Sequence, residues 1–341
     1  MKVTKLQLIN NKPENRRPHV VILGAGASKQ AFPEGDANGK IPPTMDDLIA
    51  MLRLETIVEQ AGIEYRSRNF EAIYSELYEK DPDSVFLKEI HEAIYSYFSS
   101  LQLPEQPTLY DHLLLSLCSK DLVATFNWDP FLYDAWERNV YRAPLPKIAY
   151  LHGNVRIGYC LEHRIKGEIG MFCPECDKEL TPSRLLYPIT MKSYTDDPFI
   201  EKEWDLLKIY LSKAFTLTII GYSAPTTDQE AIDIMKSTWD KNNRFIERTE
   251  VIDIKDEEVL WKQWSPFIVR TYFDCIKDFY QSRIPNFPRR TCDALLYSTR
   301  DGFFVEKNPL PRDADFDELF SWLKSLVEAE QALSDDPYTN E

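Results

Sequence analysis

The sequence predicts an α/β protein with a Rossmann-like, doubly wound parallel sheet, a helical insertion and a small zinc-ribbon module. Short apolar segments rich in β-branched residues alternate with segments of helical periodicity, which is typical of a parallel sheet covered on both faces. Glycine or polar residues follow several of the predicted strands. Two closely spaced pairs of cysteine and histidine residues interrupt this alternation and indicate the metal module.

Six segments are predicted to be strands. The first covers residues 19–23 (HVVIL), because it is short, β-branched and closed by glycine. The other five are predicted at residues 121–126, 147–151, 215–220, 250–254 and 267–273. Helical periodicity is found at residues 45–118, at about 197–214 and at about 315–333.

This order of elements divides the chain into three parts. Residues 17–154 and 185–310 are expected to form the Rossmann-like domain, with residues 45–118 as its helical insertion. Residues 155–184 are expected to form the zinc module. A C-terminal helix and a frayed tail are expected at residues 311–341.

The composition limits the partners of the protein. A chain of 341 residues with 43% hydrophobic residues can bury a substantial core. Its formal net charge of −15 argues against direct binding of nucleic acid and of anionic membranes, since both require basic surface. Neither a signal peptide nor a membrane span is indicated, and the scattered cysteines fit a reducing compartment. We therefore expect a cytoplasmic protein.

The metal module is predicted from four residues, namely Cys160, His163, Cys173 and Cys176. Each pair of ligands is separated by two residues, so that a short turn can present both to one tetrahedral Zn²⁺. Four protein ligands close the coordination shell, and such a metal stabilises the fold without activating water. The catalytic residues should therefore lie elsewhere.

The unusual residue clusters of the chain all lie at the carboxyl ends of predicted strands. They are Gly24–Ser28, Thr125–Asp129, His152-Gly153 and Gly221–Ser223. In open parallel sheets, ligands bind beyond the carboxyl ends of the strands. We therefore expect that these strand ends build one site.

Two common enzyme classes fit the motifs poorly. Gly24 and Gly26 match the first two glycines of a dinucleotide fingerprint, but Lys29 occupies the third position and no clear acidic strand end follows, which disfavours an ordinary dehydrogenase. The segment around Ser223 lacks the last glycine of a serine-hydrolase elbow, and no histidine follows His163. The glycines could also serve only a tight turn.

His152 follows a predicted apolar strand and precedes a glycine. By itself it could be a structural histidine. Asn127 and Asp129 end the neighbouring strand, which favours a role in the site, because an imidazole can accept a proton from water and an asparagine can orient the nucleophile. Asp129 could instead cap the helix that follows it.

Taken in chain order, the motifs resemble the sirtuin family of NAD-dependent enzymes over roughly residues 19–255. They are Gly24-Ala25-Gly26-Ala27-Ser28, Thr125–Asp129, His152-Gly153, the zinc module and Gly221-Tyr222-Ser223. The resemblance implies that NAD⁺ binds as a substrate in the cleft between the Rossmann-type domain and the module, which would hold structural Zn²⁺.

The resemblance also implies roles by position. The NAD⁺-binding residues would be Gly24, Ala25, Gly26, Ser28, Thr125, Gly221, Ser223 and Asp253. Ala25 and Ser28 would contact phosphates, and Asp253 would lie near the adenosine. The catalytic residues would be Asn127, Asp129 and His152, with Asn127 and Asp129 facing the nicotinamide ribose and carboxamide and His152 as the general base.

Some features depart from the sirtuin deacylases. Their glycine loop is followed by Gly-Ile-Pro-Asp-Phe-Arg, whereas residues 31–45 here contain no arginine, and His163 stands where a cysteine is usual. These features look more like the sirtuin-like proteins of bacterial antiphage defence, many of which hydrolyse NAD⁺. An NAD⁺ glycohydrolase is therefore expected. A protein-lysine deacylase and a non-catalytic module that binds NAD⁺ or ADP-ribose stay open, as do a homo-oligomer and a partner defence protein.

Overall fold

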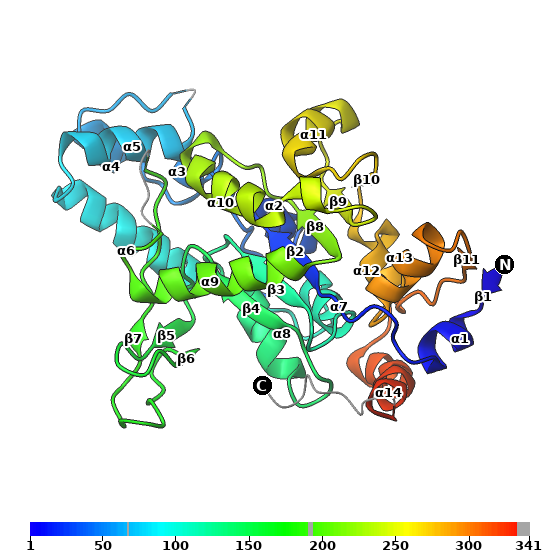
Figure 1. The fold of residues 1–341 in the computed structure, drawn as a ribbon. Helices are drawn as coiled ribbons and strands as arrows, with labels where there is room; N and C mark the ends of the chain where they lie inside the picture. The colour runs from blue at the N-terminus through cyan, green and yellow to red at the C-terminus, as the bar shows by residue number, and fades with distance from the viewer. Residues whose placement is uncertain (67, 190–193, 333–341) are drawn as a thin grey trace.

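A six-stranded, all-parallel sheet forms the centre of the molecule (Figure 1). The computed structural model describes residues 1–66, 68–189 and 194–332. The strands of the sheet are β2 (His19–Leu23), β3 (Leu122–Thr125), β4 (Lys147–Tyr150), β8 (Thr216–Ile220), β9 (Arg248–Ile252) and β10 (Phe273–Ile276). The predicted α/β class with a parallel sheet is confirmed.

The strand order is β10-β9-β8-β2-β3-β4, the order of a doubly wound nucleotide-binding sheet. From β2 in the middle, the chain adds β3 and β4 on one side and then returns to add β8, β9 and β10 on the other. The parallel register places Leu23 beside both Thr125 and Ile220. The order reverses between β2 and β8, and ligands of such sheets bind at this point.

Helices cover both faces of the sheet. Between β3 and β4, α8 (Phe131–Asn139) packs against α7 (Leu109–Leu115), whereas α9 (Pro198–Lys213) packs against α10 (Gln229–Trp239). Because parallel crossovers are right-handed, the helices of the two halves lie on opposite faces. All residues of β2, β3 and β8 are buried, as expected for strands between two helical layers.

The segment predicted to be helical, residues 45–118, holds several short helices. They are α3 (Leu48–Met51), α4 (Glu55–Gln60), α5 (Phe70–Lys80), α6 (Val85–Ser99) and α7, and they follow α2 (Ala25–Ala31). Gly62 follows the end of α4, and its φ of 72° is a left-handed conformation that stops the helix. Pro82 and Pro104 lie between later helices, where a proline cannot continue the helical hydrogen bonds.

The prediction of a strand at residues 267–273 is wrong. Phe267 ends the 3₁₀ turn η3 (Ser265–Phe267), and Arg270 has φ of 55°, so that the chain turns where a strand was expected. Pro266 favours this turn, because it has no N–H for a sheet ladder. The edge strand β10 begins only at Phe273. The fifth strand, β9, lies two residues before the predicted 250–254 and leads to α11 (Glu257–Trp264).

A second, three-stranded antiparallel sheet lies within the segment expected to bind zinc. Its strands are β5 (Ile157–Tyr159), β6 (Lys166–Glu168) and β7 (Thr181–Pro182), in the order β6-β5-β7. Lys166 Nζ lies 2.7 Å from Oε2 of the buried Glu203 on α9, and this carboxylate accepts the Tyr150 N–H of β4. The small sheet is thereby anchored to the edge of the large one.

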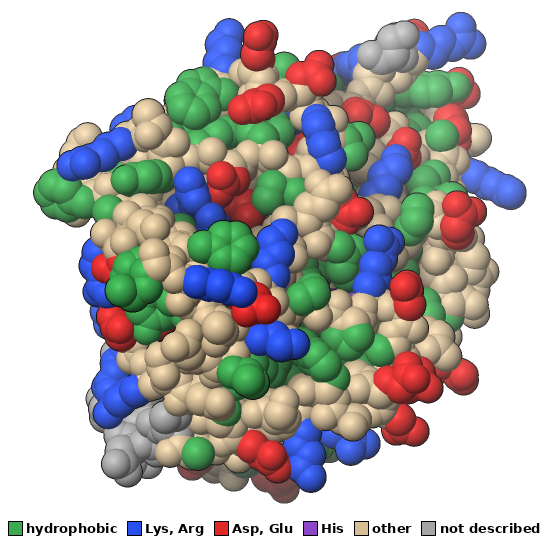
Figure 2. Space-filling view, turned by 90° about the vertical axis from the view of Figure 1, so that its right-hand side faces the viewer, with side chains coloured by type: hydrophobic (Ala, Val, Ile, Leu, Met, Phe, Trp, Pro, Cys, Tyr) green, Lys and Arg blue, Asp and Glu red, His purple; other side chains and the backbone are tan. Residues whose placement is uncertain are grey.

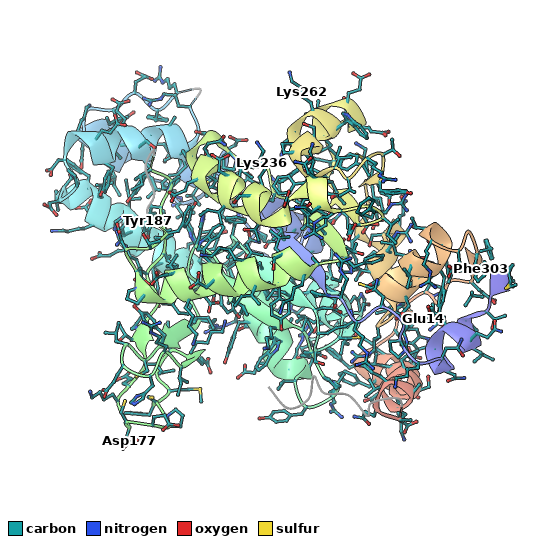
Figure 3. The ribbon with its side chains drawn as sticks, in the orientation of Figure 1. Glu14, Asp177, Tyr187, Lys236, Lys262 and Phe303 are labelled. Carbon is teal, nitrogen blue, oxygen red and sulfur yellow. The ribbon has the colours of Figure 1, made fainter. Side chains whose placement is uncertain are left out.

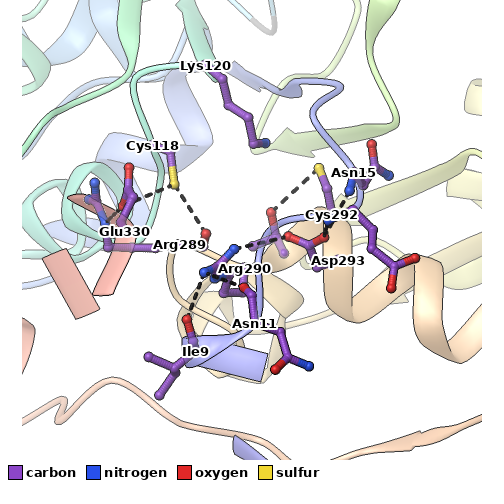
Figure 4. Close-up of polar contacts among 12 residues, drawn as sticks. Ile9, Asn11, Asn15, Cys118, Lys120, Arg289, Arg290, Cys292, Asp293 and Glu330 are labelled. Atoms are coloured by element: carbon purple, nitrogen blue, oxygen red, sulfur yellow. Dashed lines mark hydrogen bonds and ion pairs between the residues drawn. The ribbon is translucent and has the colours of Figure 1, made fainter. Parts of the chain in front are cut away.

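The N-terminal segment packs against the last third of the chain. Strand β1 (Lys2–Val3) pairs with β11 (Phe304–Val305), and α1 (Lys5–Asn10) follows β1. Arg290 donates to the carbonyl of Ile9, and the Asp293 carboxylate accepts the Asn15 N–H (Figure 4). The remaining elements are α12 (Arg283–Asn286), α13 (Thr291–Thr299), η1 (Thr226–Asp228), η2 (Lys241–Asn243) and η4 (Phe279–Gln281).

A buried arginine holds the C-terminal helix α14 (Phe316–Ala332). Arg289 Nε lies 2.5 Å from Glu330 Oε2 (Figure 4). Its guanidinium also donates to the carbonyls of Leu117 and Pro144. No described helix has the length and apolar character needed to cross a membrane. On the face shown in Figure 2, basic side chains are interspersed with acidic and apolar ones.

The ion pair between Arg289 and Glu330 leads to a prediction about the stability of the protein. We expect Glu330→Gln to lower the free energy of unfolding by about 2 kcal/mol, below the 3–5 kcal/mol of a fully buried pair because Glu330 is partly exposed. The control is Glu328→Gln on the same helix, whose pair with Lys324 is exposed; it should change stability by less than about 0.5 kcal/mol. Guanidinium unfolding measures both, and equal effects would contradict the prediction.

Candidate functional site

A cavity of about 690 Å³ lies at the carboxyl ends of the central strands. Its wall contains all of the predicted catalytic residues and all but one of the predicted NAD⁺-binding residues: Gly24, Ala25, Gly26, Ser28, Asn127, Asp129, His152, Gly221, Ser223 and Asp253. Thr125 is the exception. The cavity lies at the switch point between β2 and β8, where the strand order predicts a ligand.

Two glycine-bearing loops form one side of this cavity. The N–H of Gly26 donates to the carbonyl of Gly221 over 2.9 Å, so the loops after β2 and β8 are in backbone contact. A Cβ on Gly221, which has φ of +58°, would lie 2.3 Å from the Ala27 nitrogen, and a Cβ on Gly24 would lie 2.5 Å from the Tyr222 Cα. Neither position can therefore hold a side chain without moving the other loop.

Asn127 is fixed from three directions. Its Nδ2 donates to the carbonyl of Gly24 and to the hydroxyl of Ser28, each at 3.0 Å, and its backbone N–H donates to Thr125 Oγ1. Thr125 thus holds Asn127 and does not face the cavity. Because Nδ2 is bound to the protein, the amide offers its Oδ1 to a ligand as a hydrogen-bond acceptor.

Asp129 is buried beside Ser28. Its Oδ2 accepts the Ser28 hydroxyl at 2.6 Å, and the Tyr110 hydroxyl lies 2.6 Å from the same Ser28 oxygen. The second oxygen, Oδ1, is buried without a hydrogen-bond partner among the described residues. Burial raises the pKa of Asp129 to about 7, against hydrogen bonds from Ser28 and the Phe131 backbone that lower it. The cavity wall thus contains a carboxyl group with unused hydrogen-bonding capacity.

The alternative role of Asp129 at the start of α8 is compatible with a role in the site. Its carboxylate accepts a hydrogen bond from the backbone of Phe131, the first residue of α8, and another from the hydroxyl of Ser28 on α2.

His152 lies two residues after β4, and its backbone carbonyl accepts the Leu186 N–H. The imidazole Nε2 lies 3.3 Å from the Tyr194 hydroxyl and 3.8 Å from Asp228 Oδ1. The ring of Phe126 meets the imidazole edge-on at 4.7 Å between centroids. His152 therefore has a carboxylate and a phenol beside it in a largely apolar wall.

The outer part of the cavity carries Ser223 and Asp253. The carbonyl of Ser223 accepts Gln263 Nε2, and the side chain of Ser223 is exposed. Asp253 Oδ1 accepts the Lys255 N–H just beyond β9. Both residues lie beyond the ends of neighbouring strands, β8 and β9.

Sequence reasoning missed Tyr110, Tyr194 and Asp228. Tyr110 follows Thr108, whose capping box with Asp111 signals only the start of a helix. Asp228 immediately precedes α10 and has the residue type of an ordinary helix cap. No local signal distinguishes these residues from structural ones, because the contacts that bring them into the site, with Ser28 or with His152, join distant segments.

The four predicted zinc ligands form one cluster. Their ligand atoms all lie within 4.8 Å of one another. Cys160 Sγ lies 3.7 Å from Cys176 Sγ and 3.6 Å from His163 Nδ1, and Cys173 Sγ lies 3.6 Å from the same Nδ1. Zn–S bonds of about 2.3 Å in a tetrahedron give sulfur–sulfur edges of about 3.8 Å, so the cluster is compatible with structural zinc.

The two halves of the cluster fold in the same way. Arg164 and Asp177, which follow the two ligand pairs, both have φ of 55°. Their N–H groups donate to the carbonyls of Cys160 and Cys173, each over 2.8 Å. Two non-glycine residues in the left-handed region point to a shared constraint, which one metal ion would supply. Figure 3 shows Asp177 at the outer tip of this module.

A second hollow, of about 1140 Å³, lies beside the first. Its described lining comes from α5, α6, the turns that follow them, residues 183–189 and residues 196–197, and Leu186 lines both hollows. On its wall, His91 stacks on Tyr187 with 4.0 Å between ring centroids, and the Tyr74 hydroxyl lies 2.7 Å from His91 Nε2. Figure 3 shows Tyr187 beside α6.

The cluster of four candidate zinc ligands leads to a prediction about the zinc content of the protein. We expect the purified protein to contain about one zinc ion per chain, and Cys173→Ser to lose it and to melt at a lower temperature, because a structural zinc contributes directly to folding. Cys275→Ser, in β10 and outside the cluster, should retain the metal. Elemental analysis together with thermal unfolding measures both. Zinc retained at full occupancy in Cys173→Ser would contradict the assignment.

Because the pKa of Asp129 is raised, the stability of the protein should depend on pH through this residue. Between about pH 4 and pH 7 the folded protein keeps the Asp129 proton that the unfolded chain releases, so this residue lowers stability as the pH rises through that window. Asp129→Asn should therefore unfold like the wild type at pH 4 and be more stable at pH 8, by about 2–4 kcal/mol. Urea unfolding at both pH values is the measurement. A variant that is less stable than the wild type at pH 8 would refute this.

No family model and no curated protein matches the chain. Solved structures that match include a Sir2 homologue bound to ADP-ribose, at 14% identity over 87% of this chain and 96% of the other, with a TM-score of 0.40. A Sir2 homologue bound to NAD matches at 13% identity over 96% and 94%, with a TM-score of 0.35. A third structure, of a Sir2 enzyme, matches at 12% identity over 97% of both chains, with a TM-score of 0.34.

Proposed function

We propose that this protein is a sirtuin-like NAD⁺-consuming enzyme and that it hydrolyses NAD⁺ to nicotinamide and ADP-ribose. The observation that carries the proposal is the single cavity at the switch point of the sheet, which joins the Gly24–Ser28 loop, Asn127 and His152. These residues were assigned to one NAD⁺ site from their sequence motifs. Their convergence on one cavity is what an NAD⁺ site requires.

The dimensions and the wall of the cavity suit a dinucleotide. A volume of about 690 Å³ lies within the usual range of small-molecule and cofactor sites. The wall combines a backbone loop at the start of α2 with apolar rings such as Phe126 and Trp128. The loop would hold the pyrophosphate, and the apolar surface would hold the rings of the ligand.

The chemistry needs a positioned water. As the bond between nicotinamide and ribose breaks, its electron pair moves to the nicotinamide nitrogen and the ribose takes on cationic, oxocarbenium-like character. A water that is held and deprotonated at this carbon completes the reaction. Asn127 Oδ1 would hold the water or a ribose hydroxyl, and His152 would accept the proton.

Asp129 would recognise the nicotinamide carboxamide or the ribose. Its buried Oδ1 has no hydrogen-bond partner among the described residues, and a ligand N–H or O–H would satisfy it. Leaving this oxygen without a partner costs free energy in the empty cavity, which a bound ligand would recover.

The departures from the deacylase motifs favour hydrolysis and a role in bacterial antiphage defence. Residues 31–45 lack the arginine of the deacylase motif. A protein-lysine deacylase is the second candidate, and the larger hollow that shares Leu186 with the NAD⁺ cavity supports it, because a peptide needs its own groove. A non-catalytic module that binds NAD⁺ or ADP-ribose would need only the first cavity.

The proposed activity is tested with NAD⁺ alone. We expect the wild-type protein to release nicotinamide and ADP-ribose, and His152→Ala and Asn127→Ala each to lower kcat on the order of 10²–10³-fold, the usual range for loss of a general base or an orienting group. Asn243→Ala, in an exposed turn after α10, should keep wild-type turnover. Mass analysis of the products measures the reaction.

The same experiment with an acetylated peptide separates the candidates. O-acetyl-ADP-ribose formed only when peptide is present would favour the deacylase over the hydrolase. Calorimetric binding of NAD⁺ without any turnover would favour the binding module. Turnover of NAD⁺ by His152→Ala at the wild-type rate would remove His152 from the mechanism.

A further inference from the structure

Asp228 is a buried carboxylate in the wall of the NAD⁺ cavity to which the sequence motifs assign no role. It ends the 3₁₀ turn η1 (Thr226–Asp228) and immediately precedes α10. Its Oδ2 accepts the Tyr222 hydroxyl at 2.9 Å, and its Oδ1 lies 3.8 Å from His152 Nε2. Asp228 is only 3% exposed and His152 6%, so this contact is shielded from bulk solvent.

Asp228 lies at the start of α10, but its side chain is not oriented as in an ordinary helix cap. An aspartate at an N-cap usually accepts a backbone N–H of the first turn, which stabilises a helix by about 1 kcal/mol. Asp228 occupies the N-cap of α10, yet its side chain makes no such bond to the described first turn. The carboxylate is directed to Tyr222 and His152 instead.

Aromatic packing holds this arrangement in place. Tyr222 stacks on Phe126 with 4.1 Å between ring centroids and an interplanar angle of 7°. Phe126 in turn meets the imidazole of His152 edge-on. Tyr222 follows β8, Phe126 follows β3 and His152 follows β4, so the sheet positions the imidazole and the Tyr222 hydroxyl that donates to the Asp228 carboxylate.

We infer that Asp228 is a positioning residue that orients the His152 imidazole and stabilises its protonated form during NAD⁺ hydrolysis. The inference rests on the proposed function. When the water attacks the ribose carbon, its O–H bond breaks and the proton passes to His152, while nicotinamide leaves with the electron pair of the broken bond. The resulting imidazolium faces the Asp228 carboxylate, which lowers its free energy in a buried site.

Other titratable groups around His152 do not replace this carboxylate. Burial, followed by the charge of Asp228, raises the pKa of both Tyr194 and Tyr222, so both phenols stay protonated. The charge of Glu230 also raises the pKa of Tyr194, and the charge of Glu71 also raises that of Tyr222, but each has a smaller effect than the charge of Asp228. Asp228 is the carboxylate within ion-pair distance of the imidazole among the described residues.

The kinetic test compares Asp228→Asn with Asp233→Asn. Asp233 is an exposed aspartate of the same helix that bonds Gln229, so it controls for loss of a charge on α10. We expect Asp228→Asn to lower kcat on the order of 10²-fold with KM changed less than about threefold, since the carboxylate acts mainly in the transition state. The acid limb of its kcat–pH profile should move to lower pH, because the imidazolium has lost its partner. Asp233→Asn should behave as the wild type.

NMR spectroscopy tests the contact between Asp228 and the His152 imidazole independently of catalytic turnover. The chain has five histidines, and the His152 imidazole signal is identified by its loss in His152→Ala. The midpoint of its NMR titration should move to lower pH in Asp228→Asn and stay near the wild-type value in Asp228→Glu, which keeps the charge. ADP-ribose binding by calorimetry verifies that each variant retains the folded cavity.

The outcomes separate the two proposals. Wild-type kcat and an unchanged imidazole midpoint in Asp228→Asn would overturn the role of Asp228 and leave the hydrolase proposal standing. A wild-type protein that does not turn over NAD⁺ would overturn the hydrolase, and with it any catalytic role for Asp228. In that case the imidazole midpoint still decides whether Asp228 acts on His152.

Discussion

The contact between the loops that follow β2 and β8 determines the rest of the site. Gly26 donates its N–H to Gly221, and neither Gly24 nor Gly221 has room for a Cβ. These loops lie where the strand order reverses, so the chain on either side diverges and leaves a cavity above them. A side chain at either glycine would separate the loops and move the start of α2, on which Ser28 is carried.

In the cavity above this contact, the buried carboxyl group of Asp129 lowers the stability of the folded protein. Tyr110, Asn127 and Asp129 all bond the hydroxyl of Ser28, and one oxygen of the Asp129 carboxylate remains without a hydrogen-bond partner among the described residues. Burial favours the neutral acid, with a pKa of about 7. Strongly perturbed pKa values cluster at functional sites. The arrangement therefore fits a binding function for this end of the sheet.

Two ion pairs, each with one buried and one partly exposed partner, attach the outer modules to the Rossmann-like sheet. Lys166 and Glu203 join the small antiparallel sheet to β4, the strand that leads to His152, and Arg289 and Glu330 join α14 to the segment before β3. The zinc cluster itself lies at the outer tip of its module, away from the central sheet (Figure 3). A metal held there would act on the site only through the rigidity of the module.

Five of the six strands of the central sheet, and the residues that cluster at the strand ends, could be predicted from the amino-acid sequence. The sequence also identified Cys160, His163, Cys173 and Cys176 as one ligand set. These features depend on local periodicity and spacing, which are visible along the chain. Only the tertiary structure decided the strand order, the shift of the sixth strand to Phe273, the burial of Asp129 and the placement of Tyr110 and Asp228. Each of these depends on contacts between distant segments, such as Tyr110 with Ser28, 82 residues away, and no local pattern encodes them.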